Sequence, residues 1–159
     1  MYSKRIFRTL GMLVFAVTLA ACSDSVPAAK SACPESAQQY WKQFRSAVLK
    51  NDLAAITGMT HFPLEVRGEL DDSPKKMVPR QDFNKHFPQL LNTETELVHN
   101  SQQPATTSAH SSMKELINVT TKLHSSFCST DGEQFGVGEW IFVLRPKGWG
   151  FVQAFTNEL

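Results

Sequence analysis

The first 22 residues limit the folded domain more than any other feature of the sequence, because they have the layout of an export signal. Three basic residues lie within the first eight positions, and the uncharged, mostly apolar residues 9–19 follow. The apolar run is about half of the roughly 20 residues that a membrane-spanning helix needs, and a polar stretch comes after it. An uncleaved anchor helix is therefore disfavoured, and we expect a cleaved signal.

The end of this segment, Leu19-Ala20-Ala21-Cys22, resembles the lipobox of bacterial lipoproteins. Ordinary cleaved signals also end in small residues, and the cysteine directly after them decides for lipidation. The resemblance implies that residues 1–21 are a signal peptide, that Cys22 is the lipidation site, and that residues 22–32 form a tether. It also implies a lipid-anchored protein of the cell envelope that faces the periplasm. Ser23 at the next position favours the outer membrane, and the inner membrane stays open.

Residues 33–159 remain for the fold, enough for a single domain. Three of the 16 basic residues lie in the signal, and all 15 acidic residues follow it, so the mature chain has 13 basic residues and a net charge of −2. Nucleic-acid binding requires a clustered basic surface, so no nucleic-acid partner is expected. The sequence contains no phosphate-binding loop and no nucleophile elbow, and we expect no cofactor.

The number of cysteines predicts a disulfide bond. If Cys22 carries lipid, Cys33 and Cys128 remain as an even pair in an oxidising compartment. We predict a bond between them, which ties the start of the first helix to the C-terminal sheet. Two separate thiols are the alternative. A catalytic Cys128 is disfavoured, because His124 is the only nearby base and nothing marks a nucleophile.

Apolar spacing predicts three helices. The first begins at Pro34 and Glu35, and the second is capped by Asp52 and ends at Gly58. The third begins near Arg80, and Pro88 is expected to break or kink it. The stripe of the first helix consists of Ala37, Trp41, Phe44 and Val48.

Alternating apolar and polar residues predict strands over residues 62–70 and 117–123. Residues 135–144, apolar on both faces, are expected to form one long central strand, and residues 149–155 form the last strand. Residues 99–112 are polar and are expected to form a loop.

Helices first and an antiparallel sheet last define an α+β fold, with N-terminal helices packed on a curved, mainly antiparallel sheet. Two segments carry a further likeness: residues 40–56, which begin Tyr40-Trp41, and residues 138–151, which contain Trp140 and a closing hairpin. Both resemble the NTF2-like, cystatin-like superfamily. The resemblance implies a cone-shaped sheet, backed by helices, with an apolar pocket. Members of that superfamily include isomerases, dehydratases and hydrolases, as well as non-enzymatic binding or assembly modules.

Enzymes of that superfamily place an acid or base and a hydrogen-bond donor in the pocket. Tyr40 is the only tyrosine after the signal, and Glu139 is the one acid in the expected long strand. Glu139 is either a tuned base or, as we expect, an outward-facing acid that pairs with a cation. We assign no catalytic residue. No metal site is expected either, because the histidines, at positions 61, 86, 99, 110 and 124, are not spaced as ligands.

The aromatic residues could line a ligand pocket or fill a single core. At this chain length we expect a core. The residues concerned are Trp41, Phe44, Phe62, Phe83, Phe87, Trp140, Phe142, Trp149 and Phe151.

The functional expectation is a lipid-anchored, non-enzymatic module that binds an apolar or peptide ligand, or that interacts with a protein partner as an inhibitor or immunity protein does. The membrane is contacted through the lipid at Cys22. The alternative is an enzyme of the NTF2-like kind that uses a pocket acid such as Glu139.

We expect Cys22→Ser to leave the chain unlipidated, with its signal retained or miscut, because only the thiol of Cys22 can carry the acyl glycerol. A domain of net charge −2 has no other strong means of holding an anionic membrane. Metabolic labelling with a fatty acid, followed by membrane fractionation, checks this. Acylation of the variant in the same membrane fraction would contradict the lipobox interpretation.

Overall fold

The computed structural model of the chain describes residues 32–68, 73–96 and 110–156. The expected signal peptide, Cys22 and the tether up to residue 31 lie outside the described residues, as does most of the expected polar loop. Within the described part of the chain, no helix is long and apolar enough to cross a membrane.

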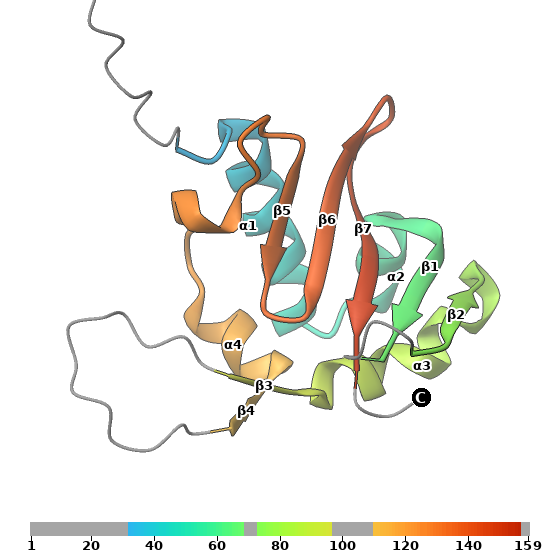
Figure 1. Cartoon of the computed structure of the whole chain (residues 1–159). Helices are drawn as coiled ribbons and strands as arrows, with labels where there is room; N and C mark the ends of the chain where they lie inside the picture. The colour runs from blue at the N-terminus through green and yellow to red at the C-terminus, as the bar shows by residue number, and fades with distance from the viewer. Residues whose placement is uncertain (1–31, 69–72, 97–109, 157–159) are drawn as a thin grey trace, which may run out of the picture.

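The fold is α+β, as predicted, with helices on one face of a five-stranded sheet of order β2-β1-β7-β6-β5. Neighbouring strands are antiparallel except β1 and β7, which are parallel. Figure 1 shows α1 crossing behind β5 and β6. In chain order the elements are α1 (Glu35–Leu49), α2 (Leu53–Gly58), β1 (Thr60–Arg67), β2 (Lys75–Val78), α3 (Arg80–Asn92), β3 (Glu94–Glu96), β4 (His110–Ser112), α4 (Met113–Val119), the 3₁₀ helix η1 (Ser125–Phe127), β5 (Gln134–Val137), β6 (Trp140–Arg145) and β7 (Gly148–Phe155).

The first two helices form where the sequence predicts them. The stripe of α1, from Ala37 through Trp41 and Phe44 to Val48, is buried. The Asp52 carboxylate caps α2 by accepting a hydrogen bond from the Ala55 amide (3.0 Å). Such a cap satisfies one of the amides that a helix start leaves without a partner.

Of the break or kink expected at Pro88, the break does not occur, because α3 continues through this residue to Asn92. Proline removes one intrahelical hydrogen bond and crowds the preceding turn, which costs about 3 kcal/mol or more. Phe83, Phe87 and Leu90 are buried on both sides of Pro88. Their packing against the core offsets the cost, so tertiary contacts decide the length of this helix.

The strand expected over residues 117–123 is wrong, since its first part belongs to helix α4. Ser112 and Glu115 form a capping box, in which the Ser112 hydroxyl accepts from the Glu115 amide and the Glu115 carboxylate accepts from the Ser112 amide. Met113 and Ile117, one helical turn apart, are buried. The capping box was the signal that outweighs the alternation after it.

Side chains of α1 hold the irregular segment that follows α4. Gln38 bonds both backbone groups of Leu123: its Nε2 donates to the carbonyl (2.6 Å), and its Oε1 accepts from the amide (3.0 Å). Trp41 Nε1 donates to the Thr120 carbonyl (2.9 Å). These bonds satisfy backbone groups that a strand would have paired in a sheet.

The single long strand expected over residues 135–144 is also wrong, because two strands, β5 and β6, form a hairpin there. Gly138 lies in the turn with φ +51°, a conformation that side chains rarely adopt. A Cβ on Gly138 would lie 2.5 Å from Leu116 Cδ2 and 2.8 Å from Met113 Sδ. Side chains of α4 therefore pack closely against the backbone at this glycine. We expected residues 135–144 to be central in the sheet. β6 is an interior strand, but β5 lies at the edge, and β7 is the middle strand.

Three short strands, β2, β3 and β4, also lie outside the predictions. β2 pairs with β1 at the edge of the sheet. The end of the expected polar loop, His110–Ser112, forms β4, which pairs with β3 in a separate two-stranded sheet.

The predicted disulfide between Cys33 and Cys128 is present, with Cα atoms 5.5 Å apart. Cys128 also forms a β-bridge with Phe135 of β5. The bond therefore ties the start of α1 to the C-terminal part of the sheet, as expected.

We expect Cys128→Ser to lower the free energy of unfolding by about 2 to 5 kcal/mol, because the bond closes a long loop and restricts the unfolded chain. Denaturant unfolding of the full chain without reductant measures this. The matched control is the double variant Cys33→Ser, Cys128→Ser. Its free energy of unfolding should equal that of the single variant, since one remaining thiol cannot form the bond. Membrane attachment should not change. Equal stability of all three proteins would contradict the prediction.

Candidate functional site

Aromatic side chains fill the space between the helices and the sheet. Phe44 of α1 contacts Phe142 of β6 with ring centroids 5.1 Å apart, and Phe142 stacks on Phe135 at 4.6 Å. This confirms the expectation of a single core, and it differs from the apolar pocket that the superfamily resemblance implies. The largest fully buried side chains are Trp41, Trp140, Phe44, Phe83, Phe87, Phe135, Phe142, Phe151, Ile56, Leu64, Met113 and Ile117. Phe62 and Trp149 are partly buried against this core.

Tyr40 lies inside this core and supports it. Its hydroxyl donates a hydrogen bond to the Met59 carbonyl (2.7 Å), and its ring packs against Phe44 and Phe142. Burial raises the pKa of Tyr40 far above its ordinary value, and a backbone hydrogen bond with Phe151 offsets only part of the rise. The phenol therefore stays neutral in the folded domain.

Glu139 does not lie within a central strand, because it occupies the turn between β5 and β6. It is half-buried. Its backbone amide points at Met113 Sδ (3.4 Å), and its carbonyl accepts from the Phe155 amide (2.9 Å). The turn therefore places Glu139 beside α4 and the end of β7, at one end of the sheet.

The histidines are spread over the fold. His61 is part of β1, and its ring packs on Gly150, where an added Cβ would lie 2.1 Å from the ring. His124 packs near Phe127, and His99 lies outside the described residues. Across residues 32–68, 73–96 and 110–156, no group of three or more His, Cys, Asp or Glu side chains could hold a metal ion.

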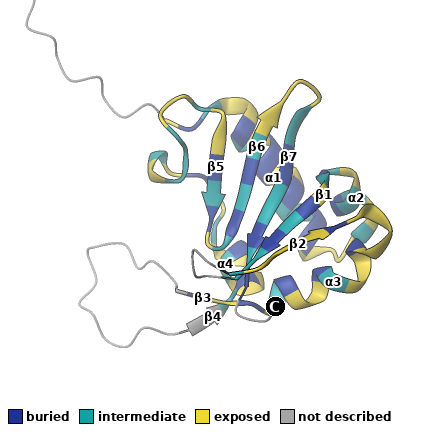
Figure 2. Ribbon diagram, turned by 45° about the vertical axis from the view of Figure 1, so that its right-hand side comes forward, coloured by how far each residue is buried: buried dark blue, intermediate teal, exposed yellow. Residues whose placement is uncertain are grey.

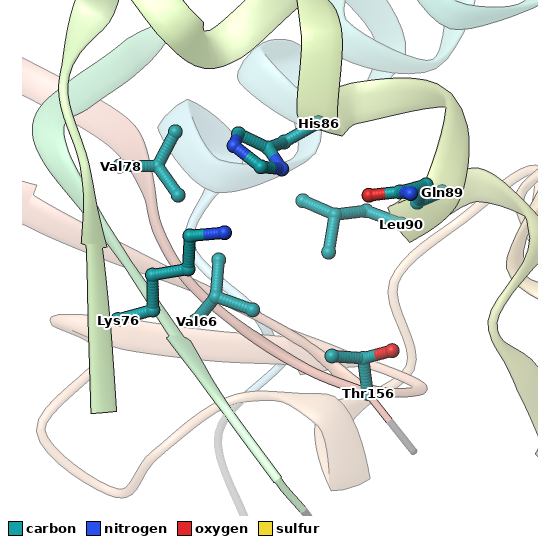
Figure 3. A pocket seen from close by; sticks show the side chains of 7 residues that line it. All are labelled: Val66, Lys76, Val78, His86, Gln89, Leu90 and Thr156. Carbon is teal, nitrogen blue, oxygen red and sulfur yellow. The ribbon is translucent and has the colours of Figure 1, made fainter. Parts of the chain in front are cut away.

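The candidate site is a small pocket of about 130 Å³ between β2 and α3, at the edge of the sheet (Figure 3). Its lining combines apolar side chains with a cation and several hydrogen-bonding groups. The lining residues are Val66, Lys76, Val78, His86, Gln89, Leu90 and Thr156. We call it the edge pocket.

Strand register and helix periodicity bring these residues together. β1 and β2 pair Val66 with Lys76, so both side chains lie on the face of the sheet that α3 covers. His86, Gln89 and Leu90, at i, i+3 and i+4, lie on one face of α3.

The end of β7 closes the edge pocket. The Thr156 amide donates to the Arg67 carbonyl (2.8 Å), which continues the pairing of β7 with β1. The Thr156 hydroxyl accepts from the Thr93 hydroxyl (3.3 Å). This wall of the pocket is therefore fixed by bonds to two neighbouring segments.

The edge pocket carries the Lys76 cation and several hydrogen-bonding groups, and among the described residues no carboxylate lines it. Lys76 lies on the exposed part of β2, which Figure 2 shows at the sheet margin. Sequence reasoning missed the pocket, because Lys75-Lys76-Met77-Val78 shows no clear alternation. The detectable signal was the placement of His86 between Phe83 and Leu90, which puts it on the inner side of an amphipathic helix.

Comparison with protein-family models, with curated protein sequences and with solved structures found no match to this chain. The properties of the site therefore rest on its own geometry.

We expect the stability of the domain to fall as the pH rises above 10, because the folded state keeps the Tyr40 proton more tightly than the unfolded chain. Protonated Tyr40 contributes its full stabilisation to the folded state below pH 10, the ordinary tyrosine pKa. Tyr40→Phe should lose this alkaline dependence, and at pH 7 it should cost about 1 kcal/mol for the lost bond to Met59.

Urea unfolding of both proteins at several pH values measures the difference, and tyrosinate absorbance reports the ionisation of Tyr40. Ionisation of this residue near pH 10 in a chain that is still folded would contradict the prediction.

Proposed function

We propose that this chain is a lipid-anchored, non-enzymatic domain of the cell envelope that binds a protein partner in the periplasm. The lipobox-like Leu19-Ala20-Ala21-Cys22 supports the anchor, and the outer membrane is the proposed location. The bond between Cys33 and Cys128 supports export, because disulfides persist in oxidising compartments.

The observation that carries the proposal is the filled space beneath the sheet. Pockets that bind drug-sized ligands usually enclose about 300–1,000 Å³. Fully buried aromatic side chains of the described residues pack under β5, β6 and β7, and the edge pocket is about 130 Å³. These volumes favour contact with a partner over transport of an apolar ligand, and so favour the inhibitor or immunity type of function.

The resemblance to the NTF2-like superfamily remains part of the proposal as a hypothesis about origin. Two helices at the start and the β6–β7 hairpin at the end support it. The superfamily contains binding and assembly modules, which agree with a partner-binding role.

The enzymatic alternative depends on Glu139. Its position in the β5–β6 turn, beside Met113, gives it no place in an enclosed pocket of the described fold. No observation of the described residues favours this alternative, so we propose no second function.

We expect the full chain, extracted from the membranes of its own cells, to have the mass of a processed chain with lipid on Cys22 and no bound apolar molecule. Native mass spectrometry measures this. In the same cells, a photo-crosslinking residue at Gln89, on the rim of the edge pocket, should give one discrete adduct with a protein. The matched control is Gln134 on β5, at the opposite edge of the sheet, where no such adduct is expected.

Two results would overturn the proposed function. One is a stoichiometric apolar molecule retained by the extracted chain. The other is turnover of a substrate by the purified chain that is lost in Glu139→Gln.

A further inference from the structure

The edge pocket combines the positive charge of Lys76, further hydrogen-bonding groups and an apolar floor. We propose that it binds a single carboxylate group, with the Lys76 ammonium as the main contact. The inference rests on the proposed partner-binding function only for the source of the carboxylate, which is either a small organic acid or an acidic side chain of the partner.

The charge of Lys76 is not neutralised by a carboxylate in the described part of the chain. Its neighbour Lys75 lies on the opposite face of β2, 4.0 Å from Glu65 Oε1. Glu65 in turn bonds Arg67 Nε at 3.0 Å. The nearest acid of β1 is therefore engaged on the other face of the sheet, and no ion pair within the described residues involves Lys76.

Two further hydrogen-bonding side chains complete the edge pocket. Figure 3 shows the amino group of Lys76, the ring of His86 and the amide of Gln89 around one opening, above Val66 and Leu90. The imidazole offers an N–H donor to a carboxylate oxygen. The Gln89 amide presents its oxygen toward the pocket in Figure 3, and it offers an N–H donor when the amide group turns over. The one acid of α3, Asp82, lies a turn before His86 and does not line the pocket.

The size and chemistry of the edge pocket select a carboxylate over larger anions. About 130 Å³ corresponds to a few water molecules at roughly 30 Å³ each. A lysine can bind a phosphate as well as a carboxylate as a point charge, but the arginine forks that hold phosphate at two points are absent from the described lining of this pocket. Val66, Val78 and Leu90 instead provide an apolar floor that suits the methylene groups of a short acid.

The test uses the full chain in detergent micelles and follows the backbone amide signals of Lys76, His86 and Gln89 by NMR. We expect acetate, at constant ionic strength, to shift these signals in a saturable way, and acetamide, its neutral counterpart, to leave them unchanged. Lys76→Gln should weaken acetate binding about tenfold, because the variant loses the charged contact to the carboxylate; this corresponds to about 1.4 kcal/mol. Lys75→Gln removes the same charge from the other face of β2 and should change the affinity less than about twofold.

A second titration identifies the source of the carboxylate. An extended peptide with one glutamate that binds at least about tenfold tighter than acetate indicates an acidic segment of a protein partner. Equal affinities indicate a small free acid. Both results support the carboxylate site.

Three results would overturn the carboxylate site. The first is no saturable shift with acetate or with the glutamate peptide, and the second is shifts with acetamide equal to those with acetate. The third is an equal loss of acetate affinity in Lys75→Gln and Lys76→Gln. Unchanged signals outside the pocket show that each variant is folded. Such a failure would leave the proposed function standing if Gln89 still crosslinks to a partner, so the two proposals fail separately.

Discussion

The contact between the Phe44 ring of α1 and the Phe142 ring of β6 organises the rest of the structure. The two rings meet edge to face, with centroids 5.1 Å apart. This geometry stabilises the fold by about 0.5–1.5 kcal/mol beyond the free energy gained from burying the ring surfaces. Phe44 also contacts Trp140 and Phe151, so one helix residue joins two neighbouring strands. This cluster sets the position of α1 on the sheet, and the remaining helices pack around it.

The position of α1 has a direct consequence for function. The same helix places Gln38 and Trp41 against the segment after α4, and Cys33 at its start is bonded to Cys128. The face of the sheet that α1 covers is thus closed by packing, hydrogen bonds and a covalent bond. A pocket of about 130 Å³ remains at the margin of the sheet, between β2 and α3. A ligand or partner group therefore has a better place to bind at the edge of the sheet than beneath it.

Local patterns predicted those elements whose signals agree with their surroundings. The stripe of α1 and the Asp52 cap act within one or two helical turns, so tertiary packing reinforces them. The prediction failed where two signals competed. Alternation over residues 117–123 suggested a strand, but the Ser112 capping box and the bonds from Gln38 favour a helix and an irregular segment. The apolar run over residues 135–144 hid a turn, because Gly138 alone indicated the positive φ.

By itself, the sequence determined the α+β class, the first helices, the disulfide partners and the core composition. These properties depend on the spacing of neighbouring residues or on the number of residues of each type, and both can be read directly from the sequence. Only the tertiary structure decided that the core is full, that Glu139 lies in a turn and that Lys76 and His86 share a pocket. Lys76 and His86 belong to a strand and a helix whose relative position is set by the register of β2 with β1 and by the packing of α3. Such positions depend on contacts between distant segments, which no local pattern encodes.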